Sequence, residues 1–358
     1  MTSAKAATAM SPASQGIFRG DVDAGEGEFD SELEFMMKDA LRNRKRIVMT
    51  VEQTGASYHV PQSAWRSLVM FAAVLSVSAA CGGVVRPNDT TIIPLQSEKV
   101  TESSGLAASN RLPGHFWTHN DSGDGPNLYA INAHGVLTGS IVLQGAAAID
   151  WEDIASYREQ DVARLIVADV GDNQSTRSSV SLYIFDEPDP HQHVRLQAFQ
   201  SLQLRYPAGP CDCESIAVDV KRRLIWLVGK SFLPAVSVHS LPLPTAAELN
   251  QPAASEPVRL THRGTLALPL TTGMDIDPST GDVYLVNYLQ CLRFKQRDSD
   301  QAGAWITQIP EVTELPRMKQ IEAVAVDSAG NVWVTSEGVP GRLARLQLTR
   351  PANTENAK

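Results

Sequence analysis

The stretch Glu214-Ser-Ile-Ala-Val-Asp219 recurs in varied form along the C-terminal two-thirds of the chain. Its five copies begin 48, 62, 58 and 50 residues apart, at Ser104, Glu152, Glu214, Thr272 and Glu322. Four copies also have an acidic or amide residue two positions earlier, namely Glu102, Asp150, Asp212 and Gln320. Self-similarity at about this period indicates a repeat architecture such as a β-propeller, in which each repeat forms one blade.

Each copy is followed by short β-rich runs that are separated by turn signals such as Asp277-Pro-Ser-Thr-Gly281. The pattern predicts an all-β, five-bladed β-propeller with four-stranded blades. The fourth strand of the fourth blade is predicted at Ala304–Ile309. The last blade lacks a fourth strand, and we expect the N-terminal strand at Thr91–Val100 to supply it and close the ring. A six-bladed ring is the alternative if Asp186–Gln200 or Thr245–Glu256, which have the composition of loops, forms a further blade.

The bulk composition limits the classes of partner. The chain has 358 residues, a hydrophobic content of 43%, which is sufficient for a packed core, and a formal net charge of −9. Binding to nucleic acid needs a clustered basic face, whereas Lys and Arg are scattered here. We therefore exclude nucleic acid and expect a monomer whose partner is a small molecule, a glycan or an envelope protein.

The longest apolar run, Leu68–Ala80, indicates export. Its thirteen residues are too few for a membrane span, which needs roughly 20, but they fit the h-region of a secretory signal peptide. The small residues before Cys81 resemble a bacterial lipobox, although Ser78 stands where that motif usually has Leu. This predicts a protein that is lipid-anchored through Cys81 to a bacterial membrane and faces the periplasm or the exterior. With Gly82 after the cysteine, that membrane would be the outer one in a Gram-negative cell. The alternative is a plain signal peptide that is cut nearby.

These features divide the chain into five segments. We expect a poorly structured extension at 1–66, the h-region and lipobox-like site at 67–81, a linker at 82–90, the β-propeller at 91–349 and a disordered tail at 350–358. Signal n-regions are short, so a translation start at Met49 or Val60 would explain the extension.

Export would also permit one disulfide, because exported proteins meet oxidising conditions. Because Cys81 would be lipidated, the disulfide would join Cys291 to either Cys211 or Cys213.

Propeller geometry brings two sets of polar residues to one face. The innermost strand of each blade starts at the face where the second strand ends, so both sets should meet at the mouth of the central channel. The ligand-binding residues predicted on this basis are His119, Asn120, Asp121, Asp124, Glu152, Asp169, Asp172, Asn173, Glu214, Lys230, Glu322 and Glu337.

Carboxylates at this density cannot all remain charged without compensation. A hard cation, most naturally Ca²⁺, would be held by Asp121, Asp172 and Glu152. A cationic or hydroxyl-rich ligand is the second explanation. In the third, the repeated glutamates Glu152, Glu214 and Glu322 accept hydrogen bonds from backbone amides of the neighbouring blade and act as inter-blade clamps.

The chain contains neither a G-x-S-x-G nucleophile elbow nor an H-E-x-x-H motif. We therefore predict a cell-envelope lipoprotein whose propeller mouth binds a ligand, with Ca²⁺ as the candidate cofactor and no catalytic role. The first alternative is a metal-dependent hydrolase of an ester, phosphoester or glycan, with Asp169 or Glu337 as general base and His119 as general acid. The second is a protein-interaction scaffold that uses the propeller rim.

Four motifs carry a resemblance to a known group of proteins. They are Trp117-Thr-His-Asn-Asp-Ser-Gly-Asp124, Asp150-Trp-Glu-Asp-Ile-Ala155, Val170-Gly-Asp-Asn173, and Glu322-Ala-Val-Ala325 together with Val334-Thr-Ser-Glu-Gly338. Over roughly residues 100–348 the chain resembles bacterial exported propeller proteins of unassigned function. More distantly it is similar to phytase-like and NHL-type propellers. Phytase-like members imply calcium and phosphoester hydrolysis, but this chain has only Lys230 as a cation in the predicted mouth.

Overall fold

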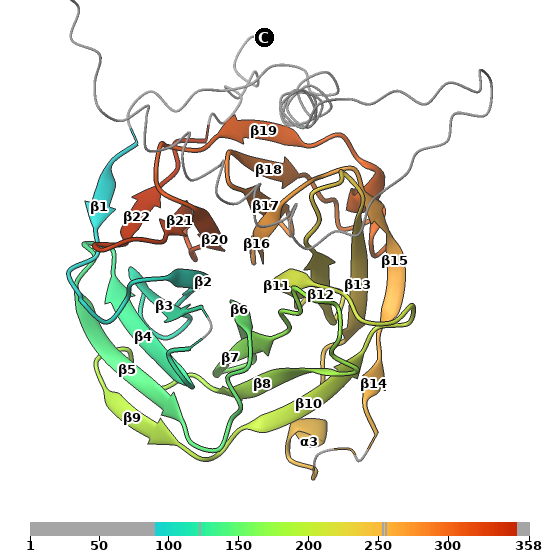
Figure 1. The fold of residues 1–358 in the computed structure, drawn as a ribbon, viewed down its shortest axis with the longest axis horizontal. Coiled ribbons are helices and arrows are strands. Elements are labelled where there is room, and N and C mark those ends of the chain that lie inside the picture. Colours follow the sequence, from blue (N-terminus) through green and yellow to red (C-terminus); the bar gives the residue numbers. More distant parts are fainter. Residues whose placement is uncertain (1–89, 122, 253, 255, 349–358) are drawn as a thin grey trace, which may run out of the picture. The chain divides into compact units, whose positions relative to one another are not determined.

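The computed structural model describes residues 90–121, 123–252, 254 and 256–348. Within these ranges it is nearly all β, and five sheets surround a common axis (Figure 1). The sequence-based expectation of a five-bladed propeller is confirmed. The segments expected at 1–66, 67–81 and 350–358, the residues 82–89 of the linker and the lipidation site Cys81 lie outside the described residues. No helix among the described residues is both long and apolar enough to cross a bilayer.

Blades 1 and 2 each contain four antiparallel strands that run from the axis outward. The strands of blade 1 are β2 (Ser103–Ala108), β3 (His115–Asn120), β4 (Asn127–Asn132) and β5 (Leu137–Leu143). The strands of blade 2 are β6 (Trp151–Glu159), β7 (Val162–Asp169), β8 (Val180–Asp186) and β10 (Gln200–Arg205).

Blades 3, 4 and 5 repeat this order. The strands of blade 3 are β11 (Cys213–Asp219), β12 (Leu224–Gly229), β13 (Val236–Pro242) and β15 (Thr261–Leu266). Those of blade 4 are β16 (Thr271–Ile276), β17 (Val283–Asn287), β18 (Gln290–Phe294) and β19 (Glu311–Glu314). Those of blade 5 are β20 (Ile321–Val326), β21 (Val332–Ser336), β22 (Arg342–Arg345) and β1 (Ile92–Pro94). The N-terminal strand β1 pairs antiparallel with β22 and closes the ring, as predicted.

The fourth strand of blade 4 was predicted at the wrong place. Ala304–Thr307 forms the 3₁₀ helix η1, which begins after Gly303 at a φ of 87°, and the outer strand β19 follows it. The reason is packing, because Trp305 is fully buried against Trp226 and Phe294. A turn of helix lets this indole enter the core between blades 3 and 4.

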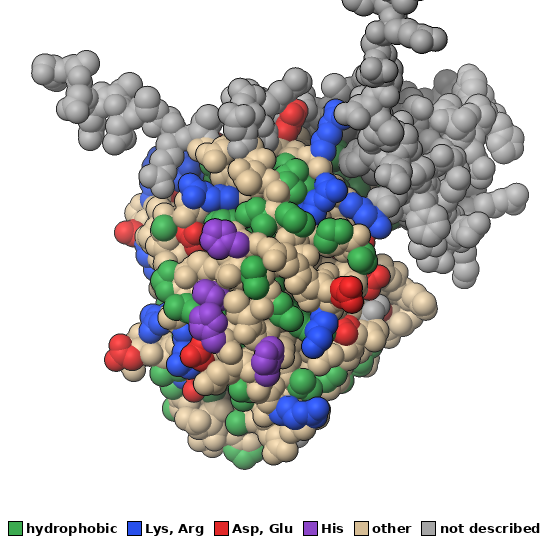
Figure 2. Space-filling model, turned by 90° about the vertical axis from the view of Figure 1, so that its left-hand side faces the viewer, with side chains coloured by type: hydrophobic (Ala, Val, Ile, Leu, Met, Phe, Trp, Pro, Cys, Tyr) green, Lys and Arg blue, Asp and Glu red, His purple; other side chains and the backbone are tan. Residues whose placement is uncertain are grey.

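The two segments considered for a sixth blade form none. Within Asp186–Gln200, strand β9 (His193–Leu196) pairs in parallel with β5 as a fifth strand on blade 1. Thr245 caps the short helix α3 (Ala246–Leu249), and strand β14 (Val258–Arg259) then joins blade 2 in parallel with β10. Histidine side chains gather on the side of the propeller where β9 lies (Figure 2).

Hydrophobic clusters fill the five interfaces between neighbouring blades. Alternate residues of each strand point to opposite faces of its sheet, so each blade packs on both neighbours. Trp226 lies between blades 3 and 4, Trp117 and Trp151 lie between blades 1 and 2, and Trp333 lies between blades 5 and 1.

The repeated sequence stretch corresponds to a β-bulge in every innermost strand. The pairing register shifts at the first residue of each copy, at Ser104, Glu152, Glu214, Thr272 and Glu322. A bulge leaves one residue unpaired and redirects its side chain. The repeat therefore marks five equivalent places where a side chain leaves the sheet near the axis.

Glycine follows the bulge in two blades because the next blade packs closely there. A Cβ on Gly273 would lie 2.9 Å from Cα of Ala323 and 3.0 Å from the carbonyl oxygen of Glu322, both backbone atoms. We expect Gly273→Ala to lower the free energy of unfolding by about 1–3 kcal/mol through overpacking. Urea denaturation measures this effect, and the exposed Ser328→Ala is the control. An unchanged midpoint in Gly273→Ala would contradict the tight inter-blade contact.

Candidate functional site

The five bulge residues have two different roles. Ser104 Oγ donates to the carbonyl oxygen of Glu152 at 3.2 Å, and Thr272 Oγ1 donates to that of Ile321 at 2.9 Å. These two hydroxyls therefore join neighbouring blades. Glu152, Glu214 and Glu322 are only 4, 4 and 6% exposed, and their side chains interact electrostatically with Lys230 and with neighbouring acids.

The inter-blade clamps are not the glutamates but two aspartates on the innermost strands β6 and β16. Asp153 Oδ2 accepts from the amide of Ile216 in blade 3 at 2.8 Å. Asp275 Oδ2 accepts from the amide of Val326 in blade 5 at 2.7 Å. Among the described residues, no backbone amide of a neighbouring blade donates to the carboxylate of a repeated glutamate, so the clamp interpretation of Glu152, Glu214 and Glu322 is wrong.

A second ring of residues follows the second strands. Asp121, Lys230 and Glu337 donate their amides to backbone carbonyls that lie two residues before the bulges, at 2.9, 3.1 and 3.1 Å. Gly171 does the same in blade 2, and Tyr288 follows β17 in blade 4. These hydrogen bonds fix the ends of the second strands beside the starts of the innermost strands. We call the combined set the axial cluster: Asp121, Asp150, Glu152, Asp212, Glu214, Lys230, Tyr288, Glu322 and Glu337.

Lys230 is the lysine of this cluster, and carboxylates hold it. Its Nζ lies 2.9 Å from Glu214 Oε2 and 5.5 Å from the centre of the Tyr288 ring. Burial lowers the pKa of Lys230, but Glu214 and the other nearby acidic groups outweigh this and raise it well above its usual value. Lys230 is therefore a fixed positive charge and cannot serve as a base near neutral pH.

Several acids of the cluster hold their protons more tightly than usual, because their pKa values are raised. Burial is the first cause in each case, and neighbouring carboxylates add to it. The pKa is raised to about 6 for Asp150, about 7 for Glu214 and Glu337, and about 8 for Glu322. The pKa of Glu152 is also raised well above its usual value. Charge at the cluster therefore changes across the neutral range.

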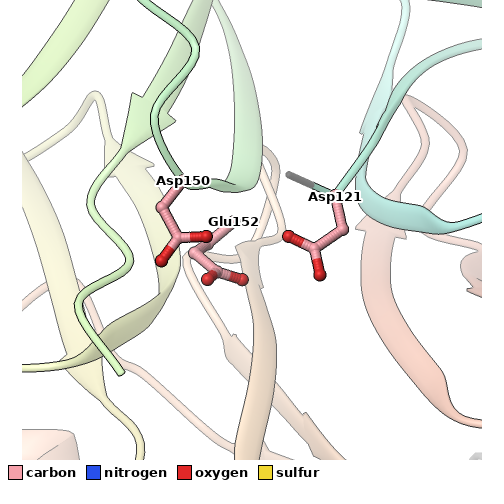
Figure 3. A group of neighbouring side chains, drawn as sticks. All are labelled: Asp121, Asp150 and Glu152. Carbon is pink, nitrogen blue, oxygen red and sulfur yellow. The ribbon is translucent and has the colours of Figure 1, made fainter. Parts of the chain in front are cut away.

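Three of these acids converge on one point. The carboxylate oxygens of Asp121, Asp150 and Glu152 lie within 4.8 Å of one another, and the side chains point together (Figure 3). A Cβ on Gly171 would lie 2.3 Å from Glu152 Oε1 and 2.5 Å from Asp150 Oδ2, so glycine is needed beside this group.

Asp172 is predicted from the sequence as a member of this metal group, but the structure does not bring it there. Asp172 accepts hydrogen bonds from the amides of Thr176 and Arg177 at 2.8 Å each, and its own amide donates to Asp212. It thus holds the loop after β7. Asp150 is the third member of the group instead of Asp172. Asp150 lies two residues before the bulge, so the sequence already placed it at the start of an innermost strand.

Other predicted residues have structural partners. His119 is fully buried, with Nδ1 2.9 Å from the carbonyl oxygen of Asn120 and its ring edge-on to Trp151. Asn120 Oδ1 accepts from the amides of Thr101 and Glu102. His119 therefore has one ring nitrogen bonded to the backbone, and its buried Nε2 has no hydrogen-bond partner among the described residues.

The group of three convergent acids does not include Asp124, Asp169 or Asn173, although Asp169 Oδ1 accepts from the backbone amide of Asp150 at 3.1 Å. Asp124 accepts from Asn120 and from the Tyr129 hydroxyl, and it lines a hollow of about 700 Å³ on blade 1. Asp169 is fully buried and paired with Arg177 at 2.9 Å. Asn173 is exposed.

The three cysteines of the propeller are free thiols. Cys213 and Cys291 are buried, and Cys211 is half-buried. Burial raises the pKa of Cys291 to about 12. Because all three thiols are free, the prediction of a disulfide between Cys291 and either Cys211 or Cys213 is wrong.

Comparison with known proteins finds no matching family model and no matching curated protein. Among solved structures, a glucose dehydrogenase is 12% identical with a TM-score of 0.41, and the match covers 72% of this chain and 100% of the other. The soluble aldose sugar dehydrogenase of Escherichia coli in its apo form gives the same identity, TM-score and share of this chain, with 99% of its own length covered. The Pan2 WD40 domain of Neurospora crassa is 10% identical at a TM-score of 0.38, covering 76% of this chain and 100% of the other. Structural similarity at these identities and TM-scores concerns the β-propeller architecture alone and does not indicate a function.

Proposed function

We propose that this protein is a non-catalytic binding protein whose axial cluster holds a ligand together with a divalent cation of the Ca²⁺ type. The observation that supports this most directly is the convergence of three acids: carboxylate oxygens of Asp121, Asp150 and Glu152 lie within 4.8 Å of one another, and Glu152 is only 4% exposed. Carboxylates this close together repel one another when they are charged, and a bound cation would offset that repulsion.

The chemistry of the three acids suits calcium. Ca²⁺ prefers oxygen ligands at 2.3–2.6 Å, so two oxygens on opposite sides of one ion are about 4.8 Å apart. The oxygens of Asp121, Asp150 and Glu152 fall within that separation. Ca²⁺ takes six to eight ligands, so carbonyls, waters or the ligand itself would complete the shell.

The hydrolase alternative draws less support from this arrangement. A general acid must reach the proton-accepting atom of the substrate, and His119 is fully buried. Asp169 is likewise fully buried and paired with Arg177, which leaves Glu337 alone of the three catalytic candidates in the axial cluster.

The lipobox-like segment that ends at Cys81 supports a location at the cell envelope, and that location remains part of the proposal.

Ca²⁺ should raise the thermal midpoint of the purified full-length chain, and EDTA should reverse the shift. A ligand that binds only the folded state stabilises it by about 2.7 kcal/mol at a hundredfold excess over Kd. Glu152→Gln should abolish the shift, because it removes one of the three carboxyl groups that converge on the proposed ion. Glu256→Gln, at an exposed site, is the matched control and should keep it. If the parent protein shows no shift with Ca²⁺, the metal part of the proposal is wrong.

A further inference from the structure

Large aliphatic side chains are exposed around the axial cluster. Of the seven large hydrophobic residues that are exposed within the described ranges, four lie in loops at the face where the innermost strands start. Their exposed fractions are 61, 56, 40 and 78% for Ile149, Leu233, Leu289 and Val339. We call these four residues the aliphatic rim.

The topology places all four on one face. Ile149 precedes β6, whereas Leu233, Leu289 and Val339 lie in the connections that follow the second strands β12, β17 and β21. Each is within three residues of a member of the axial cluster, and Ile149 and Leu289 directly adjoin Asp150 and Tyr288. Four different blade connections therefore present an aliphatic side chain beside the acids.

Neighbouring loop residues extend the apolar character of this rim. Pro234 and Ala235 follow Leu233 and are exposed, as is Pro340 after Val339. Exposed apolar residues that gather on one face of a soluble protein commonly mark a surface that binds another protein. The four rim residues come from blades 2, 3, 4 and 5, which allows contact with a segment that crosses the axis.

The charge of the axial cluster indicates which chemical group would bind inside the aliphatic rim. The axial cluster contains seven carboxyl groups and one lysine, so a positively charged group is its natural complement. An inorganic ion alone would contact the carboxylates and leave the rim in water. A Lys or Arg side chain flanked by apolar residues would satisfy both features at once.

We propose that this face docks a protein segment that inserts a Lys or Arg side chain among the carboxylates and lays its flanking apolar side chains on the aliphatic rim. This inference rests on the proposed function in that it uses the same axial cluster, and it names the ligand as a basic, apolar-flanked peptide segment. Glu337 is a suitable contact, because it is only partly buried and stands two residues from Val339. A guanidinium group binds a carboxylate through two parallel hydrogen bonds, which favours Arg over Lys.

The test is a selection of random peptides displayed on phage against the full-length chain, followed by fluorescence anisotropy with the selected peptide. We expect enrichment of sequences with Arg or Lys between aliphatic or aromatic residues. Replacing the basic residue of the peptide by Gln should weaken binding at least about tenfold. The double variant Leu289→Ser, Val339→Ser should weaken it to a similar degree. Ile309→Ser is the matched control, because Ile309 is 71% exposed and precedes β19 at the opposite end of its blade. It should bind as the parent does.

Two readouts separate this inference from the proposed function. The rim variant should keep the Ca²⁺-dependent thermal shift, since it leaves Asp121, Asp150 and Glu152 in place. A retained Ca²⁺ shift without enrichment of basic peptides would overturn the docking inference and leave the metal site standing. Basic peptides that bind the parent and the rim variant equally would also overturn it. Rim-dependent binding without any Ca²⁺ shift would support the docking surface and refute the metal.

Discussion

Asp153→Ala should lower the free energy of unfolding by roughly 2–5 kcal/mol, because each buried backbone donor left without a partner costs about 1–3 kcal/mol. The Asp153 carboxylate is fully buried and accepts the amides of Ile154 in its own strand and Ile216 in the next blade, both at 2.8 Å. The substitution removes both acceptors from an interface that water does not reach. The midpoint of urea denaturation of the full-length chain measures the loss.

A second aspartate that bonds to the next blade, Asp275 on the innermost strand of blade 4, supplies an internal comparison. Asp275 accepts from Ile276 and Val326 at 2.7 Å each, so Asp275→Ala should be destabilising to a comparable extent. Asp161→Ala, in the exposed turn between β6 and β7, is the matched control and should change stability by no more than about 0.5 kcal/mol. Losses of that small size in both clamp variants would show that the carboxylates do not join the blades.

Without divalent cations, the thermal midpoint of the protein should fall as the pH rises from 5 to 8. Folding raises the pKa of Glu214 from 4.5 to about 7 and that of Glu322 to about 8, chiefly because burial disfavours the charged forms. The pKa of Glu337 rises to about 7 for the same reason. Since the folded state holds these protons more tightly than the unfolded chain, their contribution to stability is complete below pH 4.5. It is lost as the pH passes 7 and 8.

Calcium should reduce this loss, because the cation binds the deprotonated carboxylates and replaces their protons as the compensating charge. Thermal melts across this range, with EDTA or with Ca²⁺, therefore give two curves that separate above the pKa of Asp150, about 6. Glu322→Gln should flatten the EDTA curve between pH 7 and 8. A midpoint that rises with pH in EDTA would contradict the raised pKa values of the buried glutamates.

Sequence periodicity was sufficient to predict the blades because one local feature, the bulge on the innermost strand, repeats in all of them. The order of strands then follows from short turns and from alternation of buried and exposed residues. What the pattern missed are elements that depend on packing between distant residues. Ala304–Thr307 has a strand-like composition, yet burial of Trp305 against Trp226 makes it helical. Strand β9 lies in a polar, histidine-containing loop whose partner, β5, is far away in sequence.

The candidate site was predicted in outline for the same reason. Repeated positions could be placed near the axis from register alone, which brought Glu152, Glu214 and Glu322 together with Lys230. Asp121 and Glu152 were predicted as metal ligands, and the structure does bring their carboxylates together. Whether an aspartate holds its own loop, as Asp172 does, or points to the axis, as Asp150 does, depends on the local path of the backbone. Likewise, the hydrogen-bonding residue at the blade interface turned out to be Asp153, one position after the repeated glutamate.

The parallel strands β9 and β14 bear on how such a fold can change in evolution. Propellers are assembled from like units, and recombination alters them most simply by gaining or losing a whole unit. Here β9 belongs in sequence to blade 2 but pairs with blade 1, and β14 belongs to blade 3 but pairs with blade 2. Deletion of blade 2 or blade 3 would therefore also strip a strand from the preceding blade. Within the described residues, blade 4 neither lends nor receives such a strand, so a change in the number of units would be tolerated most readily there.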